Sequence, residues 1–148
     1  MPEIFEALTA PHRLAYTYKR SLGPVLGRFF TALRDRRILG VRRVDGTVMV
    51  PPKEYDPDTG DGIDEMVEVA DAGEVVSWAW VAHPRPSQPL NTPFAYALIV
   101  LDGADTPMLH AVAAGSESEM KTGMRVKARW ADETIGAITD IACFVPAP

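Results

Sequence analysis

The sequence is poor in cysteine and histidine. One cysteine, Cys143, stands among 148 residues, and the three histidines, His12, His83 and His110, are far apart. A single cysteine excludes an internal disulfide framework and fits the reducing cytoplasm. Because Cys143 lies in an apolar segment with no histidine nearby in sequence, we expect a buried, unreactive thiol and not a nucleophile.

Long hydrophobic runs and familiar catalytic motifs are absent too. The longest apolar run, Phe94–Leu101, is far shorter than the ~18 residues that a membrane helix needs. The N-terminal letters MPEIFEAL lack the basic and then apolar order of a secretory signal. No glycine-rich phosphate loop precedes a helix, and no G-x-S-x-G motif occurs. We therefore predict a cytoplasmic protein with no membrane segment and no catalytic residues of its own.

The charge that is present is unevenly distributed. Residues 1–53 contain ten Lys and Arg against four Asp and Glu, whereas residues 54–148 contain five against sixteen. The whole chain carries a net charge of −5. The basic first part predicts a contact with something anionic, either a ligand phosphate or an acidic partner surface. A solvated helix face is the plainer alternative.

The N-terminal part predicts helical structure, a helical arm over residues 1–40. From His12 to Arg37 the pattern is helical and is interrupted at Leu22–Pro24, where proline suits the first turn of a second helix. In that second helix an apolar stripe occupies one face and is either core or an interface with another chain. The apolar stripe consists of Val25, Leu26, Phe29, Phe30 and Leu33.

The C-terminal part, residues 73–148, predicts β-strands separated by turns. Five strands are expected: Glu74–Val81, Phe94–Leu101, Met108–Ala113, Met124–Trp130 and Ala137–Val145. A single helical turn is expected at Ser116–Met120, after the third strand. This order describes a five-stranded OB-type barrel, and it leaves too few strands for an immunoglobulin-like sandwich. The predicted fold class is therefore mainly β.

The ribbon segment, residues 41–72, has the skeleton of a small metal-binding ribbon. Arg42–Gly46 stands where a C-x-x-C-G knuckle is usual, Pro51–Lys53 stands for a P-P-R step, and Asp56–Gly60 stands for a second knuckle. With Met66–Val69 and the barrel, this order resembles the acyl-CoA-associated OB-fold proteins, which join a rubredoxin-like zinc ribbon to an OB barrel. The barrel stretches YALIVLDGA, TGMRVKARW and FVPAP also match that family.

The resemblance places four former zinc-ligand positions at Arg42, Asp45, Asp56 and Thr59. A guanidinium, two carboxylates and a hydroxyl do not supply the Cys and His tetrahedron that structural zinc needs. We therefore expect a metal-free, flexible or remodelled ribbon, held weakly by a pair between Arg42 and Asp45 or Asp56. The acidic stretch Asp56–Asp64 lacks the ordered spacing of a calcium loop, so a solvated acidic loop is expected there.

The resemblance also implies a function. Proteins of this family serve as non-catalytic accessory subunits of thiolases or of thiolase-like lipid-transfer-protein aldolases, some in steroid or lipid side-chain degradation. Some associate with hotdog-fold hydratases. This chain would complete the acyl-CoA channel and stabilise the complex, with no cofactor of its own and a coenzyme A thioester as a ligand shared with the partner.

The sequence also indicates candidate contact residues and leaves two other functions open. The apolar stripe is the expected docking face, and five arginines are expected to meet coenzyme A phosphates or the partner: Arg34, Arg36, Arg37, Arg42 and Arg43. A free-standing acyl-CoA or lipid-binding module remains possible, with the proline-rich loop after His83 as a candidate lining. A nucleic-acid-binding OB protein is disfavoured because the barrel is acidic, and because Trp78, Trp80 and Tyr96 suit a core as well as a stacking platform.

Overall fold

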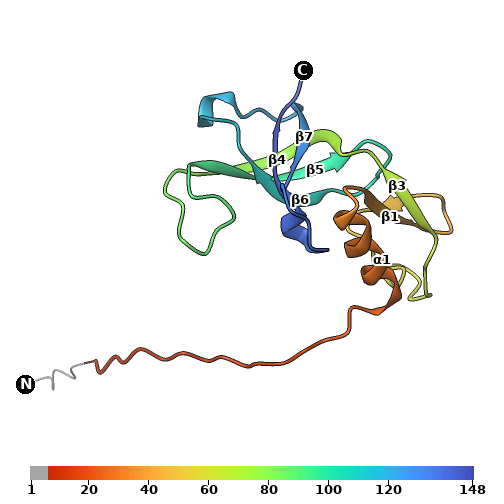
Figure 1. The fold of residues 1–148 in the computed structure, drawn as a ribbon, viewed down its shortest axis with the longest axis horizontal. Helices are drawn as coiled ribbons and strands as arrows, with labels where there is room; N and C mark the ends of the chain where they lie inside the picture. The colour runs from red at the N-terminus through yellow and green to blue at the C-terminus, as the bar shows by residue number, and fades with distance from the viewer. Residues whose placement is uncertain (1–6) are drawn as a thin grey trace, which may run out of the picture.

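The computed structural model describes residues 7–148 of the chain. An extended N-terminal arm leads into one helix beside a small sheet, and a barrel follows (Figure 1). The arm, residues 7–22, forms no helix and no strand and extends away from the rest of the molecule (Figure 1). The helix predicted from His12 to Leu22 is therefore wrong. Tyr16, Thr17 and Tyr18 have poor helix propensity because aromatic and β-branched side chains lose rotamer freedom in a helix.

Within residues 7–148 there is one α-helix, α1 (Gly23–Arg34), and it begins where the sequence predicts the second helix. Gly23 has a φ of 75°, which glycine adopts without strain, and a proline occupies the first turn. The helix buries Val25, Phe29, Ala32 and Leu33.

The ribbon segment and the few residues before it form a three-stranded antiparallel sheet. Its strands are β1 (Ile38–Arg42), β2 (Val48–Met49) and β3 (Met66–Val69), with β1 in the centre. Val41, Met49 and Ile63 form a small apolar cluster on this sheet. The ribbon segment is therefore ordered by its own strands.

The C-terminal part is a closed five-stranded barrel in the order β4-β5-β6-β8-β7. Its strands are β4 (Ala72–Val81), β5 (Phe94–Leu101), β6 (Met108–Val112), β7 (Arg125–Trp130) and β8 (Ile141–Pro146). A 3-10 turn, η1 (Glu117–Glu119), follows β6. The predicted mainly β fold class with an OB-type barrel is confirmed.

The last strand begins later than predicted. Residues 138–140 form a 3-10 turn, η2 (Ile138–Asp140), and β8 starts at Ile141. The carboxylate of buried Asp140 accepts hydrogen bonds from the backbone N–H groups of Ile135, Gly136 and Ala137. Burial raises the pKa of the Asp140 carboxyl, but these three donors together lower the pKa below its usual value. The side chain of Asp140 therefore stabilises this turn through three hydrogen bonds. The alternation that predicts strands does not predict such a turn.

The barrel closes through a narrow contact between β6 and β8. These two strands run parallel and share one register pair, Val112 with Phe144, whereas the other neighbours pair antiparallel. One hydrophobic core nevertheless connects the whole body, since Phe29 of α1 and Ile38 of β1 belong to the same buried cluster as Ile99 of β5. In the described part of the chain, no helix has the length and apolarity required to cross a bilayer.

Candidate functional site

The ribbon segment is closed by an arginine surrounded by three carboxylates. Arg43, just after β1, donates hydrogen bonds to both carboxylate oxygens of Asp56, each at 2.9 Å. The same guanidinium pairs with Asp58 and lies 3.5 Å from Asp45. These four residues form the Arg43 cluster, which joins the two positions that the sequence marks as former knuckles.

Asp56 is the buried member of the Arg43 cluster. Its side chain is 6% exposed, and its Oδ1 also accepts the N–H of Asp58 at 2.8 Å and that of Thr59 at 3.4 Å. The hydrogen bond from Arg43, assisted by the N–H of Asp58, lowers the pKa of Asp56 to about 2. The carboxylate is therefore charged at neutral pH, and each of its oxygens has a donor.

Two expectations for the ribbon segment are corrected here. Arg42 pairs with Glu65 at 3.1 Å and donates to the carbonyl of Gly46, so it contacts neither Asp45 nor Asp56. The predicted pairing is displaced by one residue, to Arg43. The loop is also not simply a solvated acidic loop, because Asp56 is buried.

The donor set does not fit a zinc ion. A guanidinium occupies the position between the carboxylates, and neither sulfur nor imidazole is present in the Arg43 cluster. Within residues 7–148, no group of three or more His, Cys, Asp or Glu side chains is arranged to hold a metal. Ion pairs and hydrogen bonds between its own side chains therefore contribute to holding the ribbon segment.

The five candidate arginines do not converge on one surface. Arg37 pairs with Glu68 at 2.6 Å, and Arg36 donates to the carbonyls of Ala131 and Asp132. Arg42 and Arg43 are engaged as described above. The side chain of Arg34 is exposed and makes no hydrogen bond with any residue between 7 and 148. Four of the five guanidinium groups thus hold segments of this chain together, and a shared phosphate site is not assembled by them.

The apolar stripe is divided between core and surface. Val25, Phe29 and Leu33 are at most 2% exposed, which corrects the expectation that the whole stripe docks on a partner. Their side chains are already covered by this chain. Leu26 and Phe30 are half-buried and remain partly accessible.

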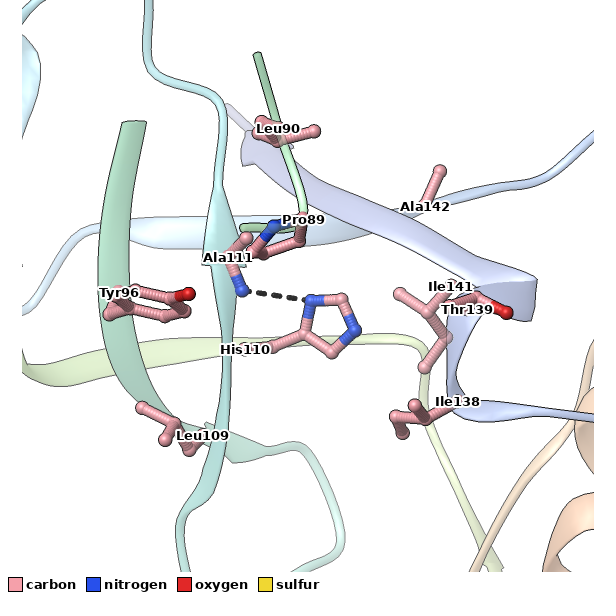
Figure 2. A pocket seen from close by; sticks show the side chains of 10 residues that line it. All are labelled: Pro89, Leu90, Tyr96, Leu109, His110, Ala111, Ile138, Thr139, Ile141 and Ala142. Carbon is pink, nitrogen blue, oxygen red and sulfur yellow. Dashed lines mark hydrogen bonds between the residues drawn. The ribbon is translucent and has the colours of Figure 1, made fainter. Parts of the chain in front are cut away.

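An apolar pocket opens on the barrel where β6 and β8 diverge. Figure 2 shows side chains from the β4–β5 loop, β5, β6, η2 and β8 around a cavity of about 450 Å³. The lining residues are Pro89, Leu90, Tyr96, Leu109, His110, Ala111, Ile138, Thr139, Ile141 and Ala142. The proline-rich loop after His83 therefore does contribute to a pocket, through Pro89 and Leu90.

His110 is the one ionisable imidazole in this pocket. Its Nδ1 accepts the N–H of Ala111 at 2.9 Å, and its ring meets Phe144 edge-on at 5.3 Å between centroids. Burial lowers the pKa of His110, against the opposing effect of the Ala111 and Ile138 backbone. The neutral ring therefore carries its proton on Nε2, which points toward the η2 and β8 side of the pocket (Figure 2).

The lining chemistry selects an uncharged, apolar ligand. None of the ten lining side chains carries a full charge, and the polar atoms available are the His110 imidazole and the hydroxyls of Tyr96 and Thr139. Cys143 lies outside the lining, fully buried, and burial raises the pKa of its thiol. The sequence missed His110 as a pocket residue. The alternation in Met108–Val112, which gives His110 the same face as buried neighbours on either side, was the available signal.

An aromatic platform for nucleic acid is not assembled. Trp78 and Trp80 pack against the barrel core, whereas Tyr96 belongs to a separate cluster with Phe94 and Cys143. The core alternative for these side chains is the one that the structure favours.

Part of the chain is similar to a known family. Residues 66–131 match the family model described as the ChsH2 C-terminal OB-fold domain. The likeness to this ChsH2-type domain extends from β3 through β7. The resemblance inferred from the sequence is thereby confirmed over the ChsH2-type segment, whereas the loss of zinc ligands in the ribbon stays a prediction.

Two solved structures share the fold. A chain of the Ltp2-ChsH2(DUF35) aldolase is 24% identical with a TM-score of 0.60, and the match covers 86% of this chain and 95% of that chain. A DUF35-family protein of unknown function from Sulfolobus solfataricus is also 24% identical, with a TM-score of 0.57 over 72% of this chain and 78% of that one. No curated protein matches this chain. The ChsH2-type barrel and the segments before it thus share one architecture with these structures.

Proposed function

We propose that this chain is a non-catalytic accessory subunit of a thiolase-like acyl-CoA enzyme of the lipid-transfer-protein aldolase type. The observation that carries the proposal is the likeness to a chain of the Ltp2-ChsH2(DUF35) aldolase, which extends over 95% of that chain. A likeness of this extent includes the helix and the ribbon segment as well as the barrel.

The chemistry of this chain supports the proposal. The pocket has one neutral histidine and no charged lining, and the buried Cys143 has a raised pKa, so neither is prepared for acyl transfer or aldol cleavage. The partner would therefore carry the catalytic residues. This chain would complete the acyl-CoA channel, with a coenzyme A thioester shared between the subunits, in lipid or steroid side-chain degradation.

The proposal is tested by complex formation and activity together. The chain and a thiolase-like protein of the same genome are co-expressed and separated by size exclusion with light scattering. We expect one peak of fixed stoichiometry and a partner whose carbon–carbon bond cleavage of an acyl-CoA increases when this chain is added in equimolar amount. Separate elution with unchanged cleavage would contradict the proposal.

The apolar pocket favours a second candidate function, a free-standing acyl-binding module. On that view the chain alone binds an uncharged ten-carbon methyl ketone, measured by calorimetry, and the variant Ile138→Arg abolishes binding. Ile138 lines the pocket and is 41% exposed, so this change leaves the core intact. If the chain elutes alone and does not bind the ketone, both candidate functions are excluded.

A further inference from the structure

The arm displays large apolar side chains to solvent. Leu14 is 69% exposed, and Tyr16 and Tyr18 are each 78% exposed. The arm belongs to no strand or helix and extends away from the body (Figure 1). Exposed apolar side chains in such a concentration mark an interaction site more often than a solvated tail.

These side chains have the spacing of a β-strand. Leu14, Tyr16 and Tyr18 alternate with smaller or polar residues, so they share one face of an extended segment. Tyrosine and threonine are also among the residues that strands prefer. In the structure α1 starts only at Gly23, so these residues are not helical in the free chain.

The arm is basic and contains no acidic residue. Arg13, Lys19 and Arg20 lie in residues 7–22 together with His12, without a single Asp or Glu. Strong opposite charge attracts such a segment, because complementary potentials guide association and suppress contacts with like-charged surfaces. The charge of the arm therefore favours an acidic partner surface.

A groove at the base of the arm continues this surface onto the body. It has a volume of about 790 Å³ and is lined by residues from the end of the arm, α1 and the ribbon segment. Leu22, Leu26 and Tyr55 supply apolar surface there. Arg20, Lys53 and one carboxylate, that of Glu54, lie beside them. Leu26, one of the residues expected to dock, thus retains a role next to the arm.

We propose that residues 12–20 of the arm add as a β-strand to an exposed strand edge of the partner subunit, at a place flanked by Asp and Glu side chains. Backbone hydrogen bonds to the edge supply affinity, while Leu14, Tyr16 and Tyr18 enter apolar sites on one face of the partner sheet. Arg13 and Lys19, on the opposite face, meet the flanking carboxylates. The inference rests on the proposed function, since it names the surface by which the accessory subunit holds its enzyme.

The test compares the two faces of the arm in the full-length chain. Binding to the thiolase-like partner is measured by calorimetry for Tyr16→Ser/Tyr18→Ser and for the matched control Ala15→Ser/Thr17→Ser. We expect the first variant to weaken binding by at least about 10-fold, because buried tyrosines are frequent hot spots. The control should stay within about 3-fold of the unaltered chain, since it changes the other face.

Hydrogen exchange supplies the readout that a loosely attached tail would not give. In the complex, backbone amides within residues 12–20 should become protected, whereas in the free chain they exchange rapidly. Thermal unfolding of each variant checks that the body is unchanged, as expected for side chains that contact none of the core.

Each result bears on the inference. Equal weakening by both double variants, or a complex whose arm amides remain unprotected, would overturn strand addition while leaving the accessory function in place. If Tyr16→Ser/Tyr18→Ser binds the partner as tightly as the unaltered chain does, strand addition is also overturned. A chain whose arm mediates pairing with a second copy, or one that forms no complex at all, would overturn the inference, and the latter would overturn the proposed function as well.

Discussion

At the scale of single residues, Arg43 joins Asp45 to Asp56 and Asp58 in the middle of the ribbon segment. Its planar guanidinium matches the two oxygens of Asp56, and this geometry is available to arginine but not to lysine. Neighbouring strand residues point to opposite faces. Arg42, the last residue of β1, therefore reaches Glu65 while Arg43 reaches the acidic loop. Sequence spacing identified the acidic partners but not which of two adjacent arginines faces them.

The Arg43 cluster predicts a specific response to acid. The pKa of Asp56 is depressed in the folded chain, so its stabilising contribution is complete above the usual carboxyl pKa and is lost as pH falls from about 4 towards about 2. The variant Asp56→Asn should be less stable at neutral pH and should lose less further stability across that interval. Denaturant unfolding at several pH values measures this.

The control for this prediction is Arg37→Ala, which breaks an exposed pair with Glu68. At neutral pH, Arg37→Ala should lower the free energy of unfolding much less than Arg43→Ala, the variant that removes the cation of the Arg43 cluster. The reason is that exposed ion pairs contribute little to stability. An acid profile for Asp56→Asn that parallels the unaltered chain would show that other groups govern acid unfolding.

At the scale of elements, α1 works as part of the core. Replacing Phe29 with alanine removes a side chain that is 2% exposed and packs in the main buried cluster. The expected loss is about 3–5 kcal/mol of unfolding free energy. Leu26→Ala, on the half-buried side of the same helix, should cost about 1 kcal/mol or less. Denaturant titration distinguishes the two, and equal losses would mean that the helix packs differently.

Elements differ in how well the sequence predicts them. The barrel strands follow from period-two alternation, as in Arg125–Trp130, where the buried residues are Val126 and Ala128. The part of the arm from His12 to Leu22 was predicted as helix together with the segment that follows it. Its two tyrosines and one threonine favour extended backbone, and its lack of packing partners removes the tertiary contacts that stabilise most helices.

At the scale of the whole molecule, one core unites parts that the sequence suggests as separate. Ile38 and Val69 of the small sheet pack in the same buried cluster as the barrel interior. Such long-range contacts are not visible in local pattern. The same limit explains why the pocket was missed, since its lining brings together Pro89, His110 and Ile138, three positions separated by 20 residues or more.

The division of charge has a spatial counterpart. Three basic residues of the first part pair with acidic residues of the ribbon segment or β3: Arg37 with Glu68, Arg42 with Glu65 and Arg43 with Asp56. The arm has no acidic neighbour in its own stretch of sequence. Part of the basic excess that the sequence shows for residues 1–53 therefore lies in the arm as accessible charge.

The Arg43 cluster also bears on how the chain is made in the cell. All of its members lie between residues 43 and 58, ahead of the first barrel strand at Ala72. During synthesis the cation and its three anions leave the ribosome together, in a fixed ratio and within a few residues of one another. The ion pairs of the Arg43 cluster can therefore form before any residue of the barrel has been synthesised.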